Sequence, residues 1–196
     1  MTDRSTVTTT TLQMLQPPEG APRPVPRDFR IDRTTSVTPE YARFLYGLVG
    51  GPWYWIDRLT WTRPVWEEEL SYPGTEFYIP YRDGVPQGFV HIQPRVVEGK
   101  VETEIRYFGL VEEAIGQGLG GALLERGIQA AWTVPERFPE LPEVRRVWVY
   151  TCSLDGPTAL ANYQARGFEI ITTEDEQKVL PPQPLGPWRS TTGLHW

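Results

Sequence analysis

The chain has 196 residues, a length that suits one globular domain with arms at its ends. A hydrophobic share of 39% is enough for a packed core and excludes an intrinsically disordered protein. The net charge of −6 argues against nucleic acid as a partner, because binding to phosphates needs clustered Lys and Arg. The single cysteine, Cys152, excludes an internal disulfide and a metal–thiolate cluster, and two histidines are too few for a zinc site.

Membrane insertion and secretion have no support in the sequence. No apolar run approaches the roughly 18 residues that a membrane-spanning helix requires. The first residues are polar and lack the apolar stretch of a secretory signal peptide. We therefore expect a cytoplasmic protein that does not bind membranes and uses no metal.

The two ends of the chain differ in composition from the middle. Residues 1–30 are rich in Thr and Pro, which favours extended chain, and we expect them to form an N-terminal arm. Residues 184–196 are interpreted in the same way, as a C-terminal tail. The domain itself is then expected over residues 31–183.

Within the domain, the patterns predict helices, then an antiparallel meander, then strands alternating with helices. Thr38 and Pro39 form a typical helix start, and Asp83-Gly84 is a hairpin signal. The predicted helices span residues 38–49, 64–70, 118–132 and 157–166. The predicted strands span residues 76–82, 88–94, 100–110, 147–152 and 168–173, with a further strand at 177–180. This order predicts a mixed α/β layer arrangement.

Glycines gather at the start of the third predicted helix, at positions 116, 118, 120 and 121. Glycines there allow main-chain N–H groups to approach an anion that also faces the positive end of the helix dipole. The letters also fit the dinucleotide fingerprint G-x-G-x-x-G. However, that fold begins with its fingerprint, whereas three antiparallel strands precede this one, and residues 111–115 separate the strand from the first glycine.

Two stretches resemble motifs of the GCN5-related N-acetyltransferase (GNAT) superfamily. Residues 107–120 are similar to its strand, bulged turn and Q/R-x-x-G-x-G/A pyrophosphate loop, although Ile115 stands at the Gln/Arg position. Residues 156–168 are similar to its pattern N-x-x-A-x-x-x-Y-x-x-x-G-F, although Gly156 replaces the Asn. The Trp-rich residues 51–58 resemble those of bacterial members.

The resemblance implies an α/β (α+β) fold with a central mixed sheet of six to seven strands and about four flanking helices. Its fourth and fifth strands would splay apart and leave a slot for the pantetheine arm of acetyl-coenzyme A. The main-chain N–H of Leu110 would hold the thioester carbonyl. The implied contacts to acetyl-coenzyme A (acetyl-CoA) are Phe108, Leu110, Ile115, Gly116, Gln117, Gly118, Leu119, Gly120, Gly121 and Tyr163.

Three residues are candidates for proton transfer during attack of an amine on the thioester. Tyr163 is the candidate general acid for the leaving thiolate; otherwise it is a core tyrosine. Glu104 aligns where some members carry a catalytic glutamate and is the leading base candidate; otherwise it pairs with Arg106 on the strand surface. His91 is a second base candidate or a packing residue, and a chain of waters is a third route.

The remaining polar and aromatic candidates have less specific roles. We interpret Cys152 as a small apolar residue rather than a nucleophile, and Asp155 as a cap of the following helix. The Trp-rich residues 53–66 either form an apolar or cation-binding wall at the acceptor site or belong to the core. Arg58 among them is available for a carboxylate.

The resemblance therefore implies an acetyl-CoA-dependent N-acetyltransferase. Its acceptor would be a primary amine of a small molecule, an amino acid or a peptide. The alternatives are transfer of a longer acyl group, transfer to oxygen, and a non-catalytic acyl-CoA-binding module on the same fold. Family members commonly form homodimers, which makes a second copy of the chain an expected partner.

Overall fold

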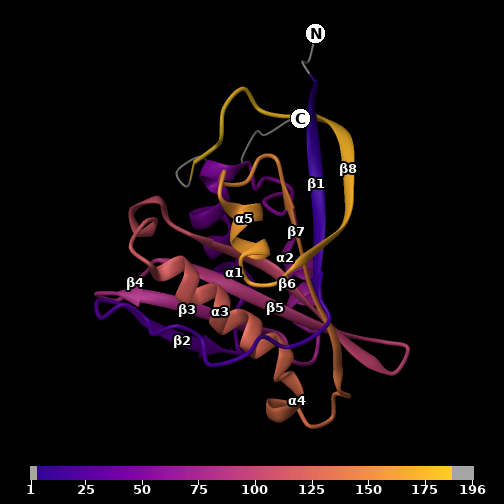
Figure 1. Cartoon of the computed structure of the whole chain (residues 1–196). Helices are drawn as coiled ribbons and strands as arrows, with labels where there is room; N and C mark the ends of the chain where they lie inside the picture. The colour runs from indigo at the N-terminus through magenta and orange to yellow at the C-terminus, as the bar shows by residue number, and fades with distance from the viewer. Residues whose placement is uncertain (1–3, 187–196) are drawn as a thin grey trace.

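A mixed sheet of eight strands organises residues 4–186, the part of the chain that this computed structural model describes (Figure 1). The strand order is β2-β3-β5-β6-β7-β1-β8, and the short β4 pairs with β3. All neighbours are antiparallel except β6 and β7, which are parallel. The strands are β1 (Arg4–Met14), β2 (Arg30–Thr34), β3 (Glu76–Arg82), β4 (Val85–Pro86), β5 (Gly88–Val97), β6 (Lys100–Leu110), β7 (Val144–Cys152) and β8 (Glu169–Val179).

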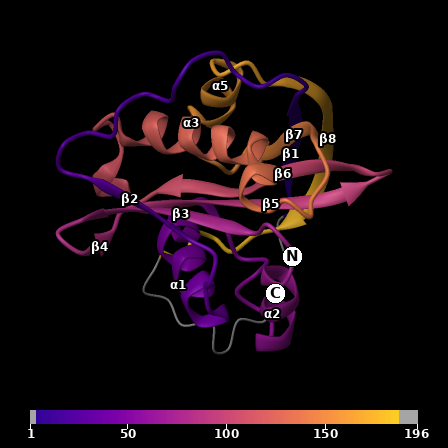
Figure 2. The same ribbon diagram turned by 90° about the horizontal axis from the view of Figure 1, so that it is seen from below.

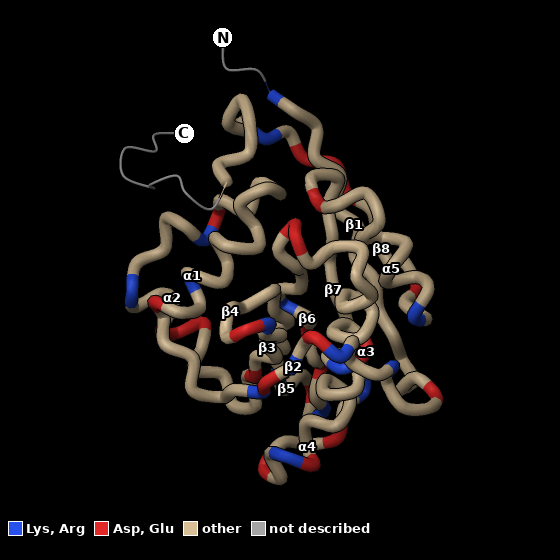
Figure 3. Tube along the Cα trace, turned by 90° about the vertical axis from the view of Figure 1, so that its left-hand side faces the viewer, with Lys and Arg blue, Asp and Glu red and all other residues tan. Residues whose placement is uncertain are grey.

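Helices cover both faces of this sheet. In Figures 2 and 3, α3 and α5 lie on one face, and α1 and α2 lie on the other. The helices are α1 (Pro39–Gly50), α2 (Arg63–Leu70), α3 (Leu119–Trp132), α4 (Val134–Arg137) and α5 (Ala159–Gln164). None of the helices in residues 4–186 is long and apolar enough to span a membrane.

Each helix layer has its own apolar core against the sheet. On the α3 face, the buried residues Leu119, Leu123 and Ile128 pack against the sheet. On the α1 face, Leu45 and Val49 belong to a second cluster with aromatic residues of α2, β3, β5 and β6. The sheet is thus covered on both sides, and residues of β6 contribute to both cores.

Most expected elements of the domain are confirmed. Thr38 caps α1 by accepting a 3.2 Å hydrogen bond from the main-chain N–H of Tyr41, as its position predicts. The two expected strands after α5 form one continuous strand, β8. A short helix, α4, begins at Val134, in a stretch between residues 132 and 147 for which the sequence patterns predict neither helix nor strand.

The main correction concerns the expected N-terminal arm. Its residues Arg4–Met14 form β1, which lies inside the sheet between β7 and β8 (Figure 1). The burial of Val7 and Leu12 and the β-branched threonines around them make this segment a strand. The sheet therefore has eight strands and not six to seven. The last ten residues of the expected tail, 187–196, lie outside the described part of the chain.

Candidate active site

Two neighbouring strands of the sheet separate partway along their length. Parallel pairing of β6 with β7 runs from Val101–Val144 to Glu104–Trp148 and ends there. Both strands continue, because β6 stays paired with β5 up to Leu110 and β7 stays paired with β1 up to Cys152. The expected splay is present, and it opens a passage through the sheet between the α3 face and the α1 face.

Main-chain donors of β6 point into this passage. The N–H of Val111 donates to the carbonyl of Gln87, on the β5 side, at 3.0 Å. Successive N–H groups of an extended strand point in opposite directions, so those of Leu110 and Phe108 point away from β5, into the passage. This is the arrangement that the resemblance implies for Leu110.

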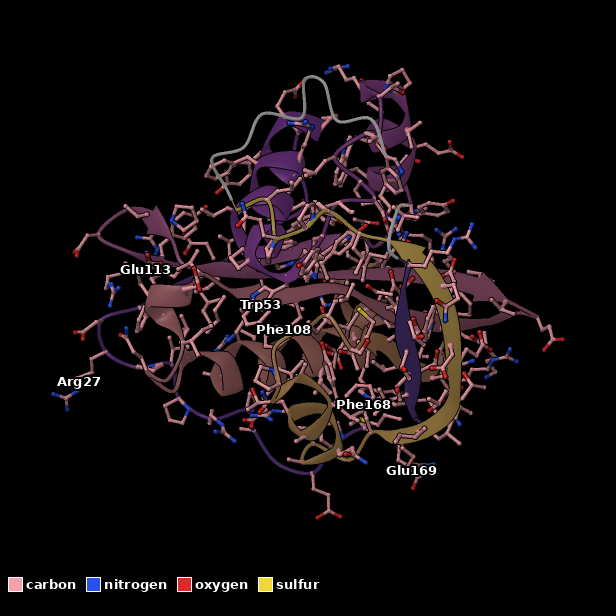
Figure 4. The ribbon with its side chains drawn as sticks, turned by 90° about the horizontal axis from the view of Figure 1, so that it is seen from above. Arg27, Trp53, Phe108, Glu113, Phe168 and Glu169 are labelled. Carbon is pink, nitrogen blue, oxygen red and sulfur yellow. The ribbon has the colours of Figure 1, made fainter. Side chains whose placement is uncertain are left out.

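A cavity of about 890 Å³ occupies the passage and reaches both faces of the sheet. Its α3 side is lined by Phe108, by Tyr163 of α5 and by the glycine turn. Its α1 side is lined by Trp53 and the residues that follow it. Figure 4 shows Trp53 and Phe108 at the middle of the molecule, between the α1 layer and α5. The cavity size is in the range of binding sites for small ligands.

The glycine turn leaves the N-terminus of α3 open. Gly116 (φ 81°) and Gly118 (φ 78°) adopt the left-handed conformation that glycine tolerates. No side chain caps α3, and a Cβ atom at Gly116 would meet nothing within 4 Å. The first N–H groups of the helix, together with its dipole, therefore suit an anion such as a diphosphate.

Two arginines strengthen the positive charge at this turn. A Cβ atom at Gly121 would lie 2.6 Å from Nη1 of Arg23 and 2.7 Å from Nη2 of Arg166. Glu125 joins them: it accepts hydrogen bonds from the main-chain N–H and Nε of Arg23, at 2.9 and 2.8 Å, and lies 3.3 Å from Arg166. The Nε of Arg166 is buried and has no hydrogen-bond partner among residues 4–186. No sequence motif points to either arginine, because Arg23 lies far from both motifs and Arg166 falls at an unspecified position of the second one.

Most of the expected cofactor contacts line the cavity. These are Phe108, Leu110, Ile115, Gly116, Gly118, Gly120, Gly121 and Tyr163. Two others are placed elsewhere. Leu119 is fully buried in the core, and the Gln117 side chain hydrogen-bonds to Arg82 at 3.0 Å and to the carbonyl of Glu113.

Of the three expected proton-transfer residues, Tyr163 is the one that lines the cavity. Its ring makes edge-on contacts with Phe108 and Phe168, with centroid distances of 6.3 and 5.9 Å. Burial and, to a smaller extent, the charge of Asp155 raise the pKa of its phenol. The hydroxyl thus keeps its proton and can act as a donor.

Glu104 lies behind the cavity wall in a buried charge cluster. Arg106, which lines the cavity, donates to Glu104 at 3.1 Å and to Glu69 of α2 at 2.6 Å. A β-bulge at Arg106, between the pairs Ile92–Ile105 and His91–Tyr107, turns both Arg106 and Tyr107 toward the α1–α2 face. Burial raises the pKa of Glu104, and Arg106 opposes that effect.

His91 is fully buried and does not line the cavity. Its ring stacks on Phe77 with centroids 4.2 Å apart, and neither ring nitrogen has a hydrogen-bond partner in the described chain. Burial and the charge of Arg106 lower its pKa to about 3. The imidazole is therefore neutral and weakly basic.

Asp155 has a different role from the one expected. It does not cap α5, whose N-cap residue is Thr158. Its carboxylate accepts hydrogen bonds from the Thr151 hydroxyl at 2.6 Å, the Cys152 N–H at 3.0 Å and the indole of Trp55 at 3.2 Å. Asp155 thereby connects Trp55, in the Trp-rich segment of residues 53–66, to the end of β7 through hydrogen bonds. Cys152 lines the cavity and is half-buried, and burial raises its thiol pKa.

The comparison with family models identifies the fold family. The model of the acetyltransferase (GNAT) family matches residues 42–168, which is more than half of the chain. The chain belongs to the GNAT acetyltransferase family. No curated protein matches it.

Solved structures of GNAT proteins share the fold at low sequence identity. A GCN5-related N-acetyltransferase from Sphaerobacter thermophilus is 16% identical with a TM-score of 0.53, over 91% of this chain and 52% of its own. A tandem GNAT protein from the clavulanic acid biosynthesis pathway is 20% identical with a TM-score of 0.54, over 88% and 54%. The chain thus spans about half the length of these two relatives.

A third structure is closer to this chain in length. An aminoglycoside acetyltransferase from an uncultured soil metagenomic sample, in complex with trehalose, is 14% identical with a TM-score of 0.50. The match covers 71% of this chain and 88% of that one. At these identities the shared feature is the GNAT fold.

Proposed function

We propose that the protein is an N-acetyltransferase that moves an acetyl group from acetyl-CoA to a primary amine. The observation that carries the proposal is the passage between β6 and β7, with an open helix N-terminus at one end and Tyr163 on its wall. A bound acetyl-CoA would supply an activated acyl group as a thioester.

Different residues of the chain would bind the cofactor, stabilise the developing charge and donate a proton. The glycine turn and the N-terminus of α3, with Arg23 and Arg166 beside them, would hold the diphosphate. The N–H of Leu110 would donate to the thioester oxygen and stabilise the charge that develops there. Tyr163 would protonate the departing sulfur.

The proposed reaction balances in protons and bonds. The ammonium form of the acceptor first loses one proton to solvent, and its nitrogen then forms the C–N bond as the C–S bond breaks. The nitrogen would then lose its second proton to water, and the sulfur would gain one from Tyr163. Return of that proton from water to the Tyr163 phenolate would leave an acetamide, the free thiol and the one proton released at the start. Glu104 does not line the cavity and is paired with Arg106, so we propose that it positions Arg106 while water accepts the amine proton.

Replacing Tyr163 by Phe tests the proposal. The ring contacts with Phe108 and Phe168 survive this change, but the donor is lost. We expect kcat, followed as thiol release with a panel of primary amines, to fall about 100-fold or more. The Kd of acetyl-CoA, from calorimetry, should change by less than about twofold because the phenol is not a main binding group.

Unchanged turnover in Tyr163→Phe would contradict the role of Tyr163 as the acid and leave the acetyl transfer itself standing. Failure of the wild-type protein to bind acetyl-CoA, or binding without turnover of any amine, would contradict the N-acetyltransferase. The last result would identify a non-catalytic acyl-CoA-binding module.

A further inference from the structure

The charged residues that line the cavity differ in whether they have partners. Arg106 pairs with two carboxylates, Glu176 pairs with Lys178 at 3.3 Å, and Asp155 accepts three hydrogen bonds. Arg58 has no carboxylate within ion-pair distance in residues 4–186. The exposed Asp57 next to it makes no side-chain hydrogen bond or ion pair there either. Of the two, Arg58 is the half-buried one.

The Arg58 guanidinium is held in place by neutral groups. Its Nε donates to the hydroxyl of Tyr107 at 3.0 Å, and its central carbon lies 4.6 Å from the ring centroid of Trp61. The remaining four N–H donors of a guanidinium are then available for another acceptor. A planar guanidinium that is ordered by stacking and has free N–H donors can bind a carboxylate through two parallel hydrogen bonds.

Position and charge both favour an anionic group at Arg58. Arg58 and Arg106 both line the cavity, and each charge disfavours the other. A carboxylate beside Arg58 would relieve this repulsion and would replace solvent around a half-buried cation. Both side chains belong to the α1–α2 end of the cavity, and the glycine turn for the cofactor lies at the other end.

The stretch of cavity wall that leads to Arg58 along the chain is mainly apolar and aromatic. Trp53, Tyr54, Trp55 and Ile56 precede it along the same wall. This wall suits the hydrocarbon part of an acceptor whose charged group reaches Arg58.

We propose that the acceptor is an amino carboxylate with an apolar side chain, whose carboxylate is bound by Arg58. This inference rests on the proposed function. It assigns Arg58 as the residue that selects the substrate, and the wall of residues 53–56 as the subsite for the side chain.

The test compares amino acids with the amines that lack only their carboxylate. Suitable pairs are phenylalanine with 2-phenylethylamine, leucine with isoamylamine, and tryptophan with tryptamine. We expect the wild-type kcat/KM to be at least about tenfold higher for the amino acid of each pair. Calorimetric titration into the complex with coenzyme A should show the same preference in Kd, whether or not the protein turns over.

Arg58→Met keeps an unbranched side chain against Trp61 but removes the donors. We expect it to lose at least about tenfold in affinity and in kcat/KM for the amino acids, and less than about twofold for the amines. For Arg58→Lys we expect values between those of the wild type and Arg58→Met, since lysine keeps the charge but cannot form two parallel hydrogen bonds to a carboxylate. Arg63→Met is the matched control: Arg63 lies exposed on α2 and pairs with Glu40 at 2.8 Å, and its loss should change neither preference.

Two outcomes would overturn the inference. One is a wild-type protein that does not prefer the amino acids, and an outright preference for the amines would point to Asp57 as the anchor of the acceptor. The other is an equal effect of Arg58→Met on both members of a pair. The failure of this inference can be told apart from the failure of the proposed function. Turnover of amines without a preference for the carboxylate refutes the inference alone. Binding of amino acids without turnover refutes the N-acetyltransferase alone.

Discussion

The α3 end and the α1–α2 end of the cavity are built in different ways. At the α3 end, a glycine turn and β6 offer main-chain N–H groups to the cavity, beside the side chains of Phe108 and Tyr163. At the other end the polar groups are side chains such as Arg58, Arg106 and Tyr150, which come from separate segments of the chain. A surface made of main chain tolerates most substitutions that leave the backbone path intact. A surface made of side chains can change its specificity through single substitutions.

Among substitutions that distinguish the two ends of the cavity, we expect the largest effect at Gly120, on the Kd of acetyl-CoA. A Cβ atom there would lie 3.5 Å from Cδ1 of Leu110, an ordinary contact, so Gly120→Ala should fold and bind acetyl-CoA nearly as the wild type does. Gly120→Glu adds a negative charge in the first turn of α3, which favours the helix but repels a diphosphate. We expect its Kd for acetyl-CoA to rise about 100-fold without a loss in Tm. Equal Kd values for the two variants would place the diphosphate elsewhere.

An intermediate effect is expected at Asp155. Asp155→Asn weakens the hydrogen bonds that attach Trp55 to the end of β7. We expect a loss of about 1–2 kcal/mol in unfolding free energy, a Tm lower by about 2–6 °C, and a KM for the acceptor raised about fivefold. The Kd of acetyl-CoA should stay constant. Asp28→Asn, at an exposed position, serves as the control, and a change in cofactor binding would show that the two ends are coupled.

The smallest effect is expected at Glu104. A carboxylate base works only when ionised, so a base role would make kcat/KM rise with pH through a pKa that burial holds above the ordinary carboxyl range. We expect instead that Glu104 positions Arg106. Glu104→Gln should then lower kcat by less than about threefold and raise the KM of the acceptor. Any rise of kcat/KM with pH seen in the wild type should persist in this variant. A fall of 100-fold with loss of that rise would make Glu104 the base. Glu102→Gln, on the same strand and paired with Arg145, is the matched control.

The two ends of the cavity also differ in how far the sequence predicts them. Glycines at fixed spacing, a helix of strong apolar period and Tyr163 before Gly167 are local patterns, and they predict the fold, the splayed strands and most of the residues that line the α3 side of the cavity. The partners of Arg58 and Arg106 are set by tertiary packing: Tyr107 faces Arg58 because of the bulge in β6, and Glu69 arrives from α2. No local pattern contains that information.

At the N-terminus, composition is a misleading signal. Prolines follow the threonines of β1, and the combined Thr- and Pro-rich composition predicts an extended arm. Its β-branched residues and the burial of Val7, Thr10 and Leu12 identify it in the structure as an interior strand. His91 is a similar case, because a strand histidine looks the same in the sequence whether it faces a cavity or the core.

The position of β1 has a consequence for how the chain reaches its final form. The Gln177 side chain donates to the hydroxyl of Thr6 although 171 positions separate them, and β8 joins the sheet through β1. This edge of the sheet therefore cannot close until the chain has been synthesised as far as β8, and closing so long a loop slows folding. Truncation before Met14 would remove not a dispensable extension but the strand that holds β8 in place.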